Sequence, residues 1–255
     1  MSFHDLHHGP RPLLLPNAWD VASALGFVAA GFEAVGTTSF GVSAAAGHPD
    51  GGRATADANV LLARQLARLG VPVSMDVEDG YSDDPAVVAS YVAGLGVAGV
   101  NLEDSLDASL VDPAAHAAKV AAVKAAAPDV FVNARVDTYW FHEDDTVDAT
   151  VARGRAYVEA GADGIFVPGV TDPELIRELA AAIPAPLNVL VLPGLTLADL
   201  GELGVRRVST GSLPYRAALD SAVEVATAVR DGGSAPGATS YHDVQERLVR
   251  FERGS

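Results

Sequence analysis

Residues 71–85 read VPVSMDVEDGYSDDP, an apolar segment that runs directly into a cluster of acidic residues. Val73 and Met75 have the alternation of a strand with a buried face, and Asp76 and Glu78 follow where that strand would end. Burying a carboxylate without a partner is energetically costly. The acidic cluster is therefore either a solvated turn or a site that holds a cation.

Similar short segments rich in Val, Ile and Leu recur on both sides of this stretch, and alanine-rich amphipathic segments separate them. Eight strand–helix units in roughly 230 residues favour one (β/α)8 barrel over two domains. An open doubly wound sheet is the alternative, but no G-x-G-x-x-G sequence follows the first strand. The expected strands are 13–15, 34–37, 73–76, 99–102, 131–134, 164–167, 187–190 and 206–209.

The fold class predicted from this alternation is α/β, with a single TIM-type barrel. We expect residues 1–229 to form the barrel, as the catalytic domain. The segment RDGGSAPGATS (230–240) has the composition of a linker, and YHDVQERLVRF (241–251) has the pattern of a short amphipathic helix. Residues 230–255 are therefore expected to be a linker and an extra C-terminal helix rather than a second domain.

The composition excludes several classes of function. The chain has 33 acidic residues against 17 lysines and arginines, and a net charge of −16 opposes binding to nucleic acid and to anionic membranes. The absence of cysteine excludes disulfides, thiolate metal sites and cysteine catalysis. No apolar run reaches the ~20 residues that span a bilayer, and the N-terminus lacks the apolar region of a signal peptide. We expect a cytoplasmic protein.

In a barrel of this type the active site forms at the C-terminal ends of the strands. Polar residues follow at least five of the expected strands, and they would converge on one mouth. They are Asn17, Trp19 and Asp20 after the first strand, Asp76 and Glu78 after the third, Glu103 and Asp104 after the fourth, Arg135 and Asp137 after the fifth, and Ser209, Thr210 and Ser212 after the eighth.

Three of these acids suit a divalent cation. Asp76, Glu78 and Glu103 offer only oxygen ligands, which Mg²⁺ prefers. Because Mg²⁺ keeps most of its waters and takes one or two direct carboxylates, we expect Asp76 to be the direct ligand and the other two to act through waters. The alternative is that Asp76 caps the following turn and Glu78 is solvated.

Three other residues at this mouth have both a functional and a structural interpretation. Arg135, the only basic residue expected there, could stabilise negative charge on a substrate oxygen, or it could simply pair with Asp137. Ser39, in the sequence TSFG, could help to hold a carboxylate or could belong to an ordinary turn. Asp50 lies on a loop that could close over the mouth, or it could be a turn former.

The N-terminal segment HDLHH (residues 4–8) holds three of the seven histidines. Such a cluster could bind metal adventitiously, but disorder is the favoured interpretation for a short terminal segment.

A set of motifs in this order resembles the isocitrate lyase/phosphoenolpyruvate mutase superfamily over about residues 13–216. The motifs are PNAWDVASA (16–24), GFEAVGTTSFGVSAAAGHPDG (31–51), PVSMDVEDGY (72–81), GVNLEDS (99–105), FVNARVD (131–137) and AGADGIFVPG (160–169). The resemblance implies an α/β barrel, usually dependent on Mg²⁺, that makes or breaks C–C or P–C bonds next to a 2-oxo acid. It also implies a homo-oligomer, a dimer or a tetramer, in which the eighth helix packs on a neighbouring subunit.

The resemblance also implies a role for individual residues. Mg²⁺, or Mn²⁺ in its place, would be held by Asp76 directly and by Glu78 and Glu103 through waters. The substrate carboxylate would bind Ser39 and the amides of Phe40 and Gly41. Arg135 would stabilise an oxyanion, and Asp50 would be a gating-loop acid near the reacting group. Asn188 would contact the substrate, and Trp19 would lie at the mouth of the first strand.

One region departs from the superfamily pattern. The lyases that act on isocitrate and methylisocitrate carry a K-K-C-G-H loop after the fourth strand, whereas this chain has EDSLDASLVDPAAHAAK (103–119), with no cysteine. We therefore expect a Mg²⁺-dependent lyase acting on a small 2-oxo or 2-hydroxy carboxylate, with decarboxylation of an oxaloacetate-like acid favoured. The alternatives are a phosphonopyruvate mutase or hydrolase, and a 2-oxo-acid binding protein with weak or no turnover.

Overall fold

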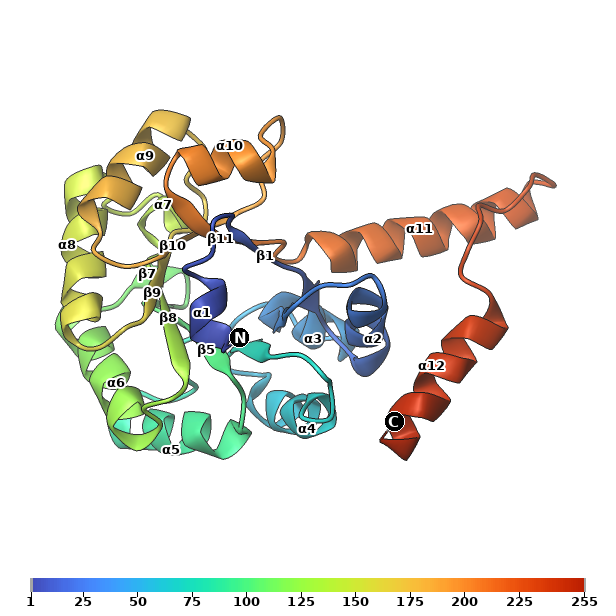
Figure 1. Cartoon of the computed structure of the whole chain (residues 1–255), viewed down its shortest axis with the longest axis horizontal. Coiled ribbons are helices and arrows are strands. Elements are labelled where there is room, and N and C mark those ends of the chain that lie inside the picture. Colours follow the sequence, from blue (N-terminus) through green and yellow to red (C-terminus); the bar gives the residue numbers. More distant parts are fainter. Residues whose placement is uncertain (1, 255) are drawn as a thin grey trace.

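The computed structural model of this chain describes residues 2–254, and parallel strands form a barrel at its centre (Figure 1). β1 and β2 stand at the two ends of the sheet order but are separated only by Pro16, whose ring removes a backbone donor and interrupts the first strand. β1 pairs with β11 and β2 pairs with β3, so the ring closes. In sheet order the strands are β1 (Leu13–Leu15), β11 (Val205–Ser209), β10 (Leu187–Leu190), β9 (Gly164–Phe166), β8 (Phe131–Arg135), β5 (Gly99–Glu103), β4 (Val73–Asp76), β3 (Val35–Thr37) and β2 (Asn17–Ala18).

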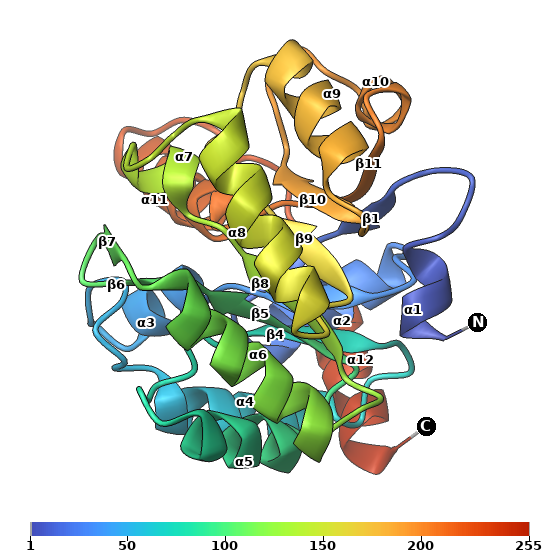
Figure 2. The ribbon, with the colours of Figure 1, turned by 90° about the vertical axis from the view of Figure 1, so that its left-hand side faces the viewer.

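Helices surround the strands, as Figures 1 and 2 show from two directions. Three of the long helices begin with Asp-Pro, in which the aspartate side chain accepts a hydrogen bond from a first-turn amide and proline occupies the first turn. The helices are α1 (Phe3–Leu6), α2 (Val21–Ala29), α3 (Ser39–Ala45), α4 (Ala56–Leu66), α5 (Pro85–Leu95), α6 (Pro113–Ala126), α7 (Thr138–Phe141), α8 (Val147–Glu159), α9 (Pro173–Ala182), α10 (Leu197–Glu202), α11 (Leu213–Arg230) and α12 (Tyr241–Arg253).

The predicted fold class is confirmed, and the eight expected strands lie within one residue of the observed bounds. The small hairpin of β6 (Ser105–Leu106) and β7 (Ser109–Leu110) was not predicted. Both residues of its turn, Asp107 and Ala108, have left-handed φ angles of 50° and 62°. Turns of this kind are usually signalled by Asn-Gly or Asp-Gly, and Asp-Ala gives no such signal.

Alternation along the strands separates an apolar outer layer from a polar interior. In β4, β5 and β8 the residues packed in the main core are Val73, Met75, Val100, Leu102, Val132 and Ala134. The intervening positions point to the other side of the sheet, into the barrel. Apart from Gly99 and Phe131, the first residues of β5 and β8, they carry Ser74, Asp76, Asn101, Glu103, Asn133 and Arg135.

The N-terminal segment closes the end of the barrel at which the strands begin, so the expected disorder of residues 4–8 is wrong. Phe3 packs with Leu13, Leu15, Ala34 and Phe131 in a small second core, and α1 lies over the middle of the ring in Figure 1. The His7 ring stacks on Phe131 at 3.9 Å between centroids, and its Nδ1 lies 2.9 Å from the Phe3 carbonyl oxygen. Burial lowers the pKa of His7 to about 3, so the ring is neutral. Burial of apolar surface therefore orders this segment.

Replacing Phe3 with alanine is expected to lower the free energy of unfolding by about 3 kcal/mol, since removing a buried phenylalanine leaves a cavity. Phe3 is only 5% exposed, and it packs against Gly99, where a Cβ atom would lie 2.7 Å from its ring. Urea unfolding followed by circular dichroism measures the change. The matched control is Leu61→Ala, because Leu61 is 60% exposed. A loss for Phe3→Ala no larger than that for Leu61→Ala would contradict the packing role of α1.

The C-terminal part extends from the barrel and then turns back. Figure 1 shows α11 projecting away from the ring and α12 returning beside α2. Residues 231–240 between them have no regular secondary structure. Arg68 fixes α12 to the barrel, because its Nη2 donates to the carbonyl oxygen of Phe251 at 2.7 Å. None of the helices within residues 2–254 is long and apolar enough to cross a membrane.

Candidate active site

A cavity of about 850 Å³ opens at the C-terminal ends of the strands. One part of its wall is polar, and another part is apolar. The polar part includes Asn17, Ser39, Asp50, Asp76, Asn101 and Arg135, and the apolar part includes Phe40, Trp140, Phe166, Pro168, Leu190 and Leu192. Such a cavity suits a small polar molecule with a hydrocarbon portion.

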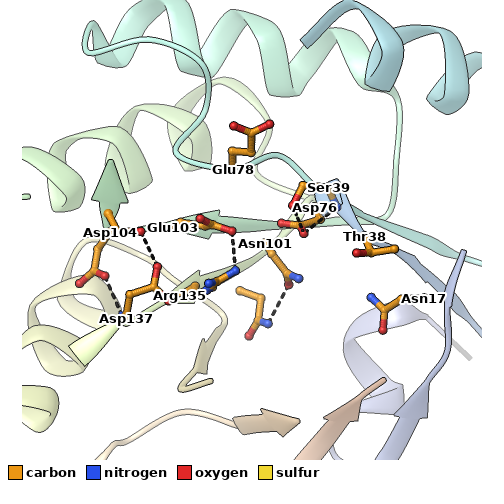
Figure 3. Close-up of polar contacts among 12 residues, drawn as sticks. Asn17, Thr38, Ser39, Asp76, Glu78, Asn101, Glu103, Asp104, Arg135 and Asp137 are labelled. Atoms are coloured by element: carbon orange, nitrogen blue, oxygen red, sulfur yellow. Dashed lines mark hydrogen bonds and ion pairs between the residues drawn. The ribbon is translucent and has the colours of Figure 1, made fainter. Parts of the chain in front are cut away.

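Asp76 stands at the end of β4 with one carboxylate oxygen bound and the other free. Its Oδ2 accepts hydrogen bonds from the Ser39 backbone N–H at 3.0 Å and from the Ser39 hydroxyl at 2.8 Å (Figure 3). Its Oδ1 is buried and has no hydrogen-bond partner within the described residues. A buried carboxylate oxygen without a donor fits a bound cation, so Asp76 suits the role of a direct Mg²⁺ ligand. Both donors of Ser39 serve Asp76 here, and its contact with a substrate carboxylate stays a prediction.

Arg135 and two carboxylates form an ionic cluster beside Asp76. Its Nη1 donates to Glu103 Oε1 at 2.5 Å, and its Nε donates to Asp137 Oδ1 at 2.6 Å. Burial alone would lower the pKa of Arg135, but the two acids raise it above its usual value, so the guanidinium stays charged. Burial raises the pKa of Glu103, although Arg135 opposes that rise. The cluster thus holds a fixed cation at the cavity wall.

Further hydrogen bonds behind this cluster hold Asp137 in place. The Ser105 hydroxyl donates to Asp137 Oδ2 at 2.5 Å, and the Asp137 backbone N–H donates to Asp104 Oδ1 at 2.9 Å. Asp104 in turn accepts from the Tyr157 hydroxyl at 2.7 Å and from Arg153 Nη1 at 3.0 Å. Burial raises the pKa of Asp104 to about 6. Asp104 therefore supports the cluster from behind, away from the cavity.

Glu78 is turned away from Asp76, as Figure 3 shows. Its Oε1 accepts from the Thr55 hydroxyl at 2.5 Å, and its Oε2 accepts from the Arg53 backbone N–H at 3.0 Å. Among residues 2–254, no three His, Asp or Glu side chains are grouped so as to hold a metal ion. Asp76 is therefore the one carboxylate placed to bind a cation directly. For Glu78 to act through a water, as predicted, its hydrogen bonds to Thr55 and Arg53 would have to break.

Asp50 belongs to the loop between α3 and α4, and it lines the cavity together with Arg135 and Asp76. Desolvation and the charge of Asp76 raise the pKa of Asp50, and Arg135 opposes the rise. The same loop is tied to the end of β4 by Arg53, which donates to both carboxylate oxygens of Asp79 at 3.0 and 2.6 Å. The loop that carries Asp50 is therefore anchored to the acidic stretch 76–79.

The other residues implied by the resemblance lie around the cavity at different depths. Phe40 lines it, whereas Gly41 packs beneath, where a Cβ atom would lie 2.8 Å from Thr38 and 3.0 Å from Trp19. The Trp19 ring lies edge-on to Tyr215 at 5.3 Å between centroids. Asn188 is fully buried, and its Nδ2 donates to the Ser209 hydroxyl at 3.0 Å.

Two arginines that lie at or near the cavity, Arg207 and Arg216, were not predicted there. Arg216, in the first turns of α11, also lines the cavity, so the expectation that Arg135 is the only basic residue at the mouth is wrong. Arg216 follows the turn after the eighth strand, and no pattern in the sequence indicates that it reaches the cavity. Arg207 on β11 is 1% exposed and lies inside the barrel. The sequence predicts a strand at Arg207, but a strand pattern alone does not predict that a cation is buried in it.

The family of this chain can be assigned from its relatives. The model of the phosphoenolpyruvate phosphomutase family matches residues 3–230. An uncharacterized protein of Mycobacterium tuberculosis is 57% identical over 252 residues, which cover 99% of this chain and 98% of that protein. The oxaloacetate decarboxylase of a Bradyrhizobium species is 31% identical over 196 residues, which cover 69% of this chain and 66% of that enzyme.

Solved structures agree with this assignment. A presumed phosphonomutase from Burkholderia cenocepacia J2315 is 40% identical, with a TM-score of 0.83, over 88% of this chain and 97% of that one. A phosphonopyruvate hydrolase, solved with oxalate and Mg²⁺, is 26% identical, with a TM-score of 0.87, over 99% of this chain and 97% of that one. Members of this superfamily are enzymes and include lyases, mutases and hydrolases. The chain therefore belongs to the phosphoenolpyruvate phosphomutase family, within the superfamily that its sequence motifs indicated.

Proposed function

We propose that this chain is a Mg²⁺-dependent lyase that acts on a small 2-oxo or 2-hydroxy carboxylate, with decarboxylation of an oxaloacetate-like acid as the favoured reaction. The observation that carries the proposal is the free, buried oxygen of Asp76 in the same cavity as the charged guanidinium of Arg135. One group offers a place for a cation, and the other offers charge-assisted donors for an oxyanion.

Each residue has a distinct part in this reaction. Mg²⁺ would be held by Asp76 directly and by Glu103 through water, and when bound it would supply Lewis-acid stabilisation to the 2-oxo oxygen. When the bond to the leaving carboxylate breaks, its electron pair moves toward that oxygen and carbon dioxide departs. Arg135 is placed to stabilise the negative charge that develops, since Glu103 and Asp137 hold its guanidinium in position.

The region after β5 supports decarboxylation over cleavage of a larger acid. A lyase that releases a carboxylate-bearing fragment needs a group to protonate it, and this chain has no cysteine. The short hairpin β6–β7 follows β5, in the region where the sequence departs from the K-K-C-G-H pattern of the isocitrate and methylisocitrate lyases. Carbon dioxide leaves without accepting a proton, and the enolate that remains can take its proton at carbon from water, so the reaction does not need a cysteine acid.

The second candidate is P–C chemistry on a phosphonopyruvate-like acid. Asp50 favours it, because this carboxylate faces the cavity beside Arg135 and its pKa is raised. Both solved relatives described above also have names from this chemistry. A third candidate is a protein that binds 2-oxo acids without turnover.

Turnover of purified protein against three acids separates these candidates. Oxaloacetate, phosphonopyruvate and 2-methylisocitrate are each assayed with Mg²⁺, and Asp76→Asn protein is the control for reaction caused by Mg²⁺ in solution. We expect the unaltered protein to form pyruvate from oxaloacetate faster than the background rate measured with Asp76→Asn. Phosphate or phosphoenolpyruvate from phosphonopyruvate would favour the second candidate. Oxalate binding without any turnover would favour the third.

We also propose a homo-oligomer, a dimer or a tetramer. The exposed part of α11 carries Leu219, Val223 and Val229, which are 50%, 66% and 64% exposed. Apolar side chains grouped on a projecting helix commonly mark a protein contact. Light scattering at micromolar concentration is expected to give a multiple of the 26.2 kDa chain mass. A stable monomer would contradict this prediction.

A further inference from the structure

Three buried polar side chains meet inside the barrel below the cavity. Asn101 on β5 accepts two hydrogen bonds at its Oδ1, one from Asn133 Nδ2 on β8 at 2.9 Å and one from Arg207 Nη2 on β11 at 3.0 Å. Only the amide oxygen can accept from two N–H donors, so these contacts determine which way the Asn101 amide is turned. Its Nδ2 must then lie on the side away from both donors.

That side faces the cavity. Asn101 lines the cavity wall, and β5 lies between β4 and β8, so its amide stands between Asp76 and Arg135 (Figure 3). Within residues 2–254, Asn101 Nδ2 donates no hydrogen bond, although the side chain as a whole is 4% exposed. The cavity wall therefore has an amide N–H donor, Asn101 Nδ2, without a partner among the described residues, while Asn133 and Arg207 hold the oxygen of the same amide.

Arg207 is unusual among the arginines described. It is 1% exposed, no carboxylate lies within ion-pair distance of it among the described residues, and its Nη1 has no hydrogen-bond partner there. Burial lowers the pKa of Arg207 to about 9, which leaves it charged at neutral pH, and Asp76 opposes the shift. A buried charge without a close counterion destabilises a fold, so its presence needs a compensating role.

Its contacts indicate that role. Besides Asn101, Arg207 reaches the Ser209 hydroxyl through Nε at 3.4 Å, and Ser209 also lines the cavity. Arg207 thus holds two polar groups of the cavity wall from below. Its positive charge also lies under a site that must attract an anion into a chain of charge −16.

We propose that Asn101 is a substrate-contacting residue whose Nδ2 donates to an oxygen of a small carboxylate, and that Arg207 is the positioning residue that fixes this amide. The donor would select acids that present an oxygen between Asp76 and Arg135. This role rests on the proposed function in one respect, because it takes the ligand to be a small carboxylate.

The Asn101→Asp substitution removes the Nδ2 donor and keeps an oxygen that can accept from Asn133 and Arg207. The new carboxylate still accepts from Asn133 and gains an ion pair with Arg207, but it places an oxygen where the N–H donor stood. With Mg²⁺ at saturation for each protein, calorimetry is expected to show oxalate binding weakened by about tenfold or more, since a hydrogen bond to a charged group is lost. The melting temperature should be unchanged or higher.

The matched control is Ser74→Ala. Ser74 lies two residues before Asp76 on the same side of β4, is buried, and makes no side-chain hydrogen bond within the described residues. Oxalate affinity is expected to stay within about twofold of the unaltered protein, as for a residue that does not contact the ligand. An equal loss in this control would assign the effect to general disturbance of the interior and overturn the proposal.

Arg207→Met gives a second test that leaves Asn101 and the cavity wall chemically intact. It removes a buried charge, so the melting temperature should not fall, yet oxalate should bind several-fold more weakly because the amide is free to turn. Unchanged oxalate affinity would overturn the positioning role of Arg207.

The outcomes also separate this proposal from the proposed function. Oxalate binding equal in Asn101→Asp and the unaltered protein overturns the Asn101 proposal and leaves the lyase function standing. Loss of oxalate binding in Asn101→Asp, together with no turnover of any acid by the unaltered protein, supports the Asn101 proposal and contradicts the lyase function. Failure of the unaltered protein to bind oxalate with Mg²⁺ contradicts both.

Discussion

Replacing Arg135 with lysine is expected to lower kcat by about 10²–10³, the typical effect of removing a donor aimed at a developing oxyanion. Arg135 uses Nε and Nη1 for two different carboxylates, Asp137 and Glu103. A lysine has a single ammonium group, so it cannot keep both contacts and also present a planar donor to the substrate. Its charge remains, so binding of the carboxylate should change less than turnover.

The measurement is steady-state turnover of the acid identified in the three-substrate assay, with circular dichroism and Mg²⁺ titration to check the fold and the metal. Arg155→Lys is the matched control, because Arg155 lies on the outer helix α8 and donates to the Ala182 carbonyl oxygen at 3.0 Å. Its kcat should be unchanged. If Arg135→Lys also keeps kcat within a few-fold, Arg135 serves only to balance the two acids, and the electrophile lies elsewhere.

Replacing Asp76 with alanine is expected to abolish measurable Mg²⁺ binding and turnover. Asp76 is the only acid in the described cavity wall with a buried carboxylate oxygen that has no donor. Glu103→Gln should weaken Mg²⁺ binding by about 10–100-fold, the range for a residue that acts on a metal through its neighbours. The order of the two effects distinguishes the direct ligand from the water-mediated one.

Isothermal titration of EDTA-treated protein with Mg²⁺ measures both variants. Asp129→Asn is the control, because Asp129 is an exposed acid just before β8, at the opposite end of that strand from Arg135, and its loss changes the net charge equally. A larger loss for Glu103→Gln than for Asp76→Ala would contradict the assignment of Asp76 as the direct ligand.

The barrel was predictable because its signals are local and repeated. Each Asp-Pro pair marks a helix start, and each short Val-rich or Leu-rich segment marks a strand, so the eight units could be counted from the sequence. Asp76, Glu103 and Arg135 could be placed together for the same reason, since residues that follow parallel strands meet at one end of a barrel. Their contacts confirm that Glu103 and Arg135 meet.

The interior and the direction of single side chains were not predictable. Asn101 and Arg207 lie inside strands rather than at their ends, and whether such a residue faces helices or the barrel depends on register. Glu78 has a left-handed φ of 49°, which turns its side chain toward Thr55 although its spacing from Asp76 suggests a shared site. The packing of Phe3 under the barrel depends on space left by Gly99, far along the chain.

The central claim is that Asp76 and Arg135 form one Mg²⁺-dependent site for a small carboxylate. Calorimetric titration of oxalate into the EDTA-treated protein, repeated after Mg²⁺ is restored, tests it most directly. We expect oxalate to bind only when Mg²⁺ is present, and expect Asp76→Asn to bind none in either condition. Equal oxalate affinity with and without Mg²⁺ in the unaltered protein would contradict the claim.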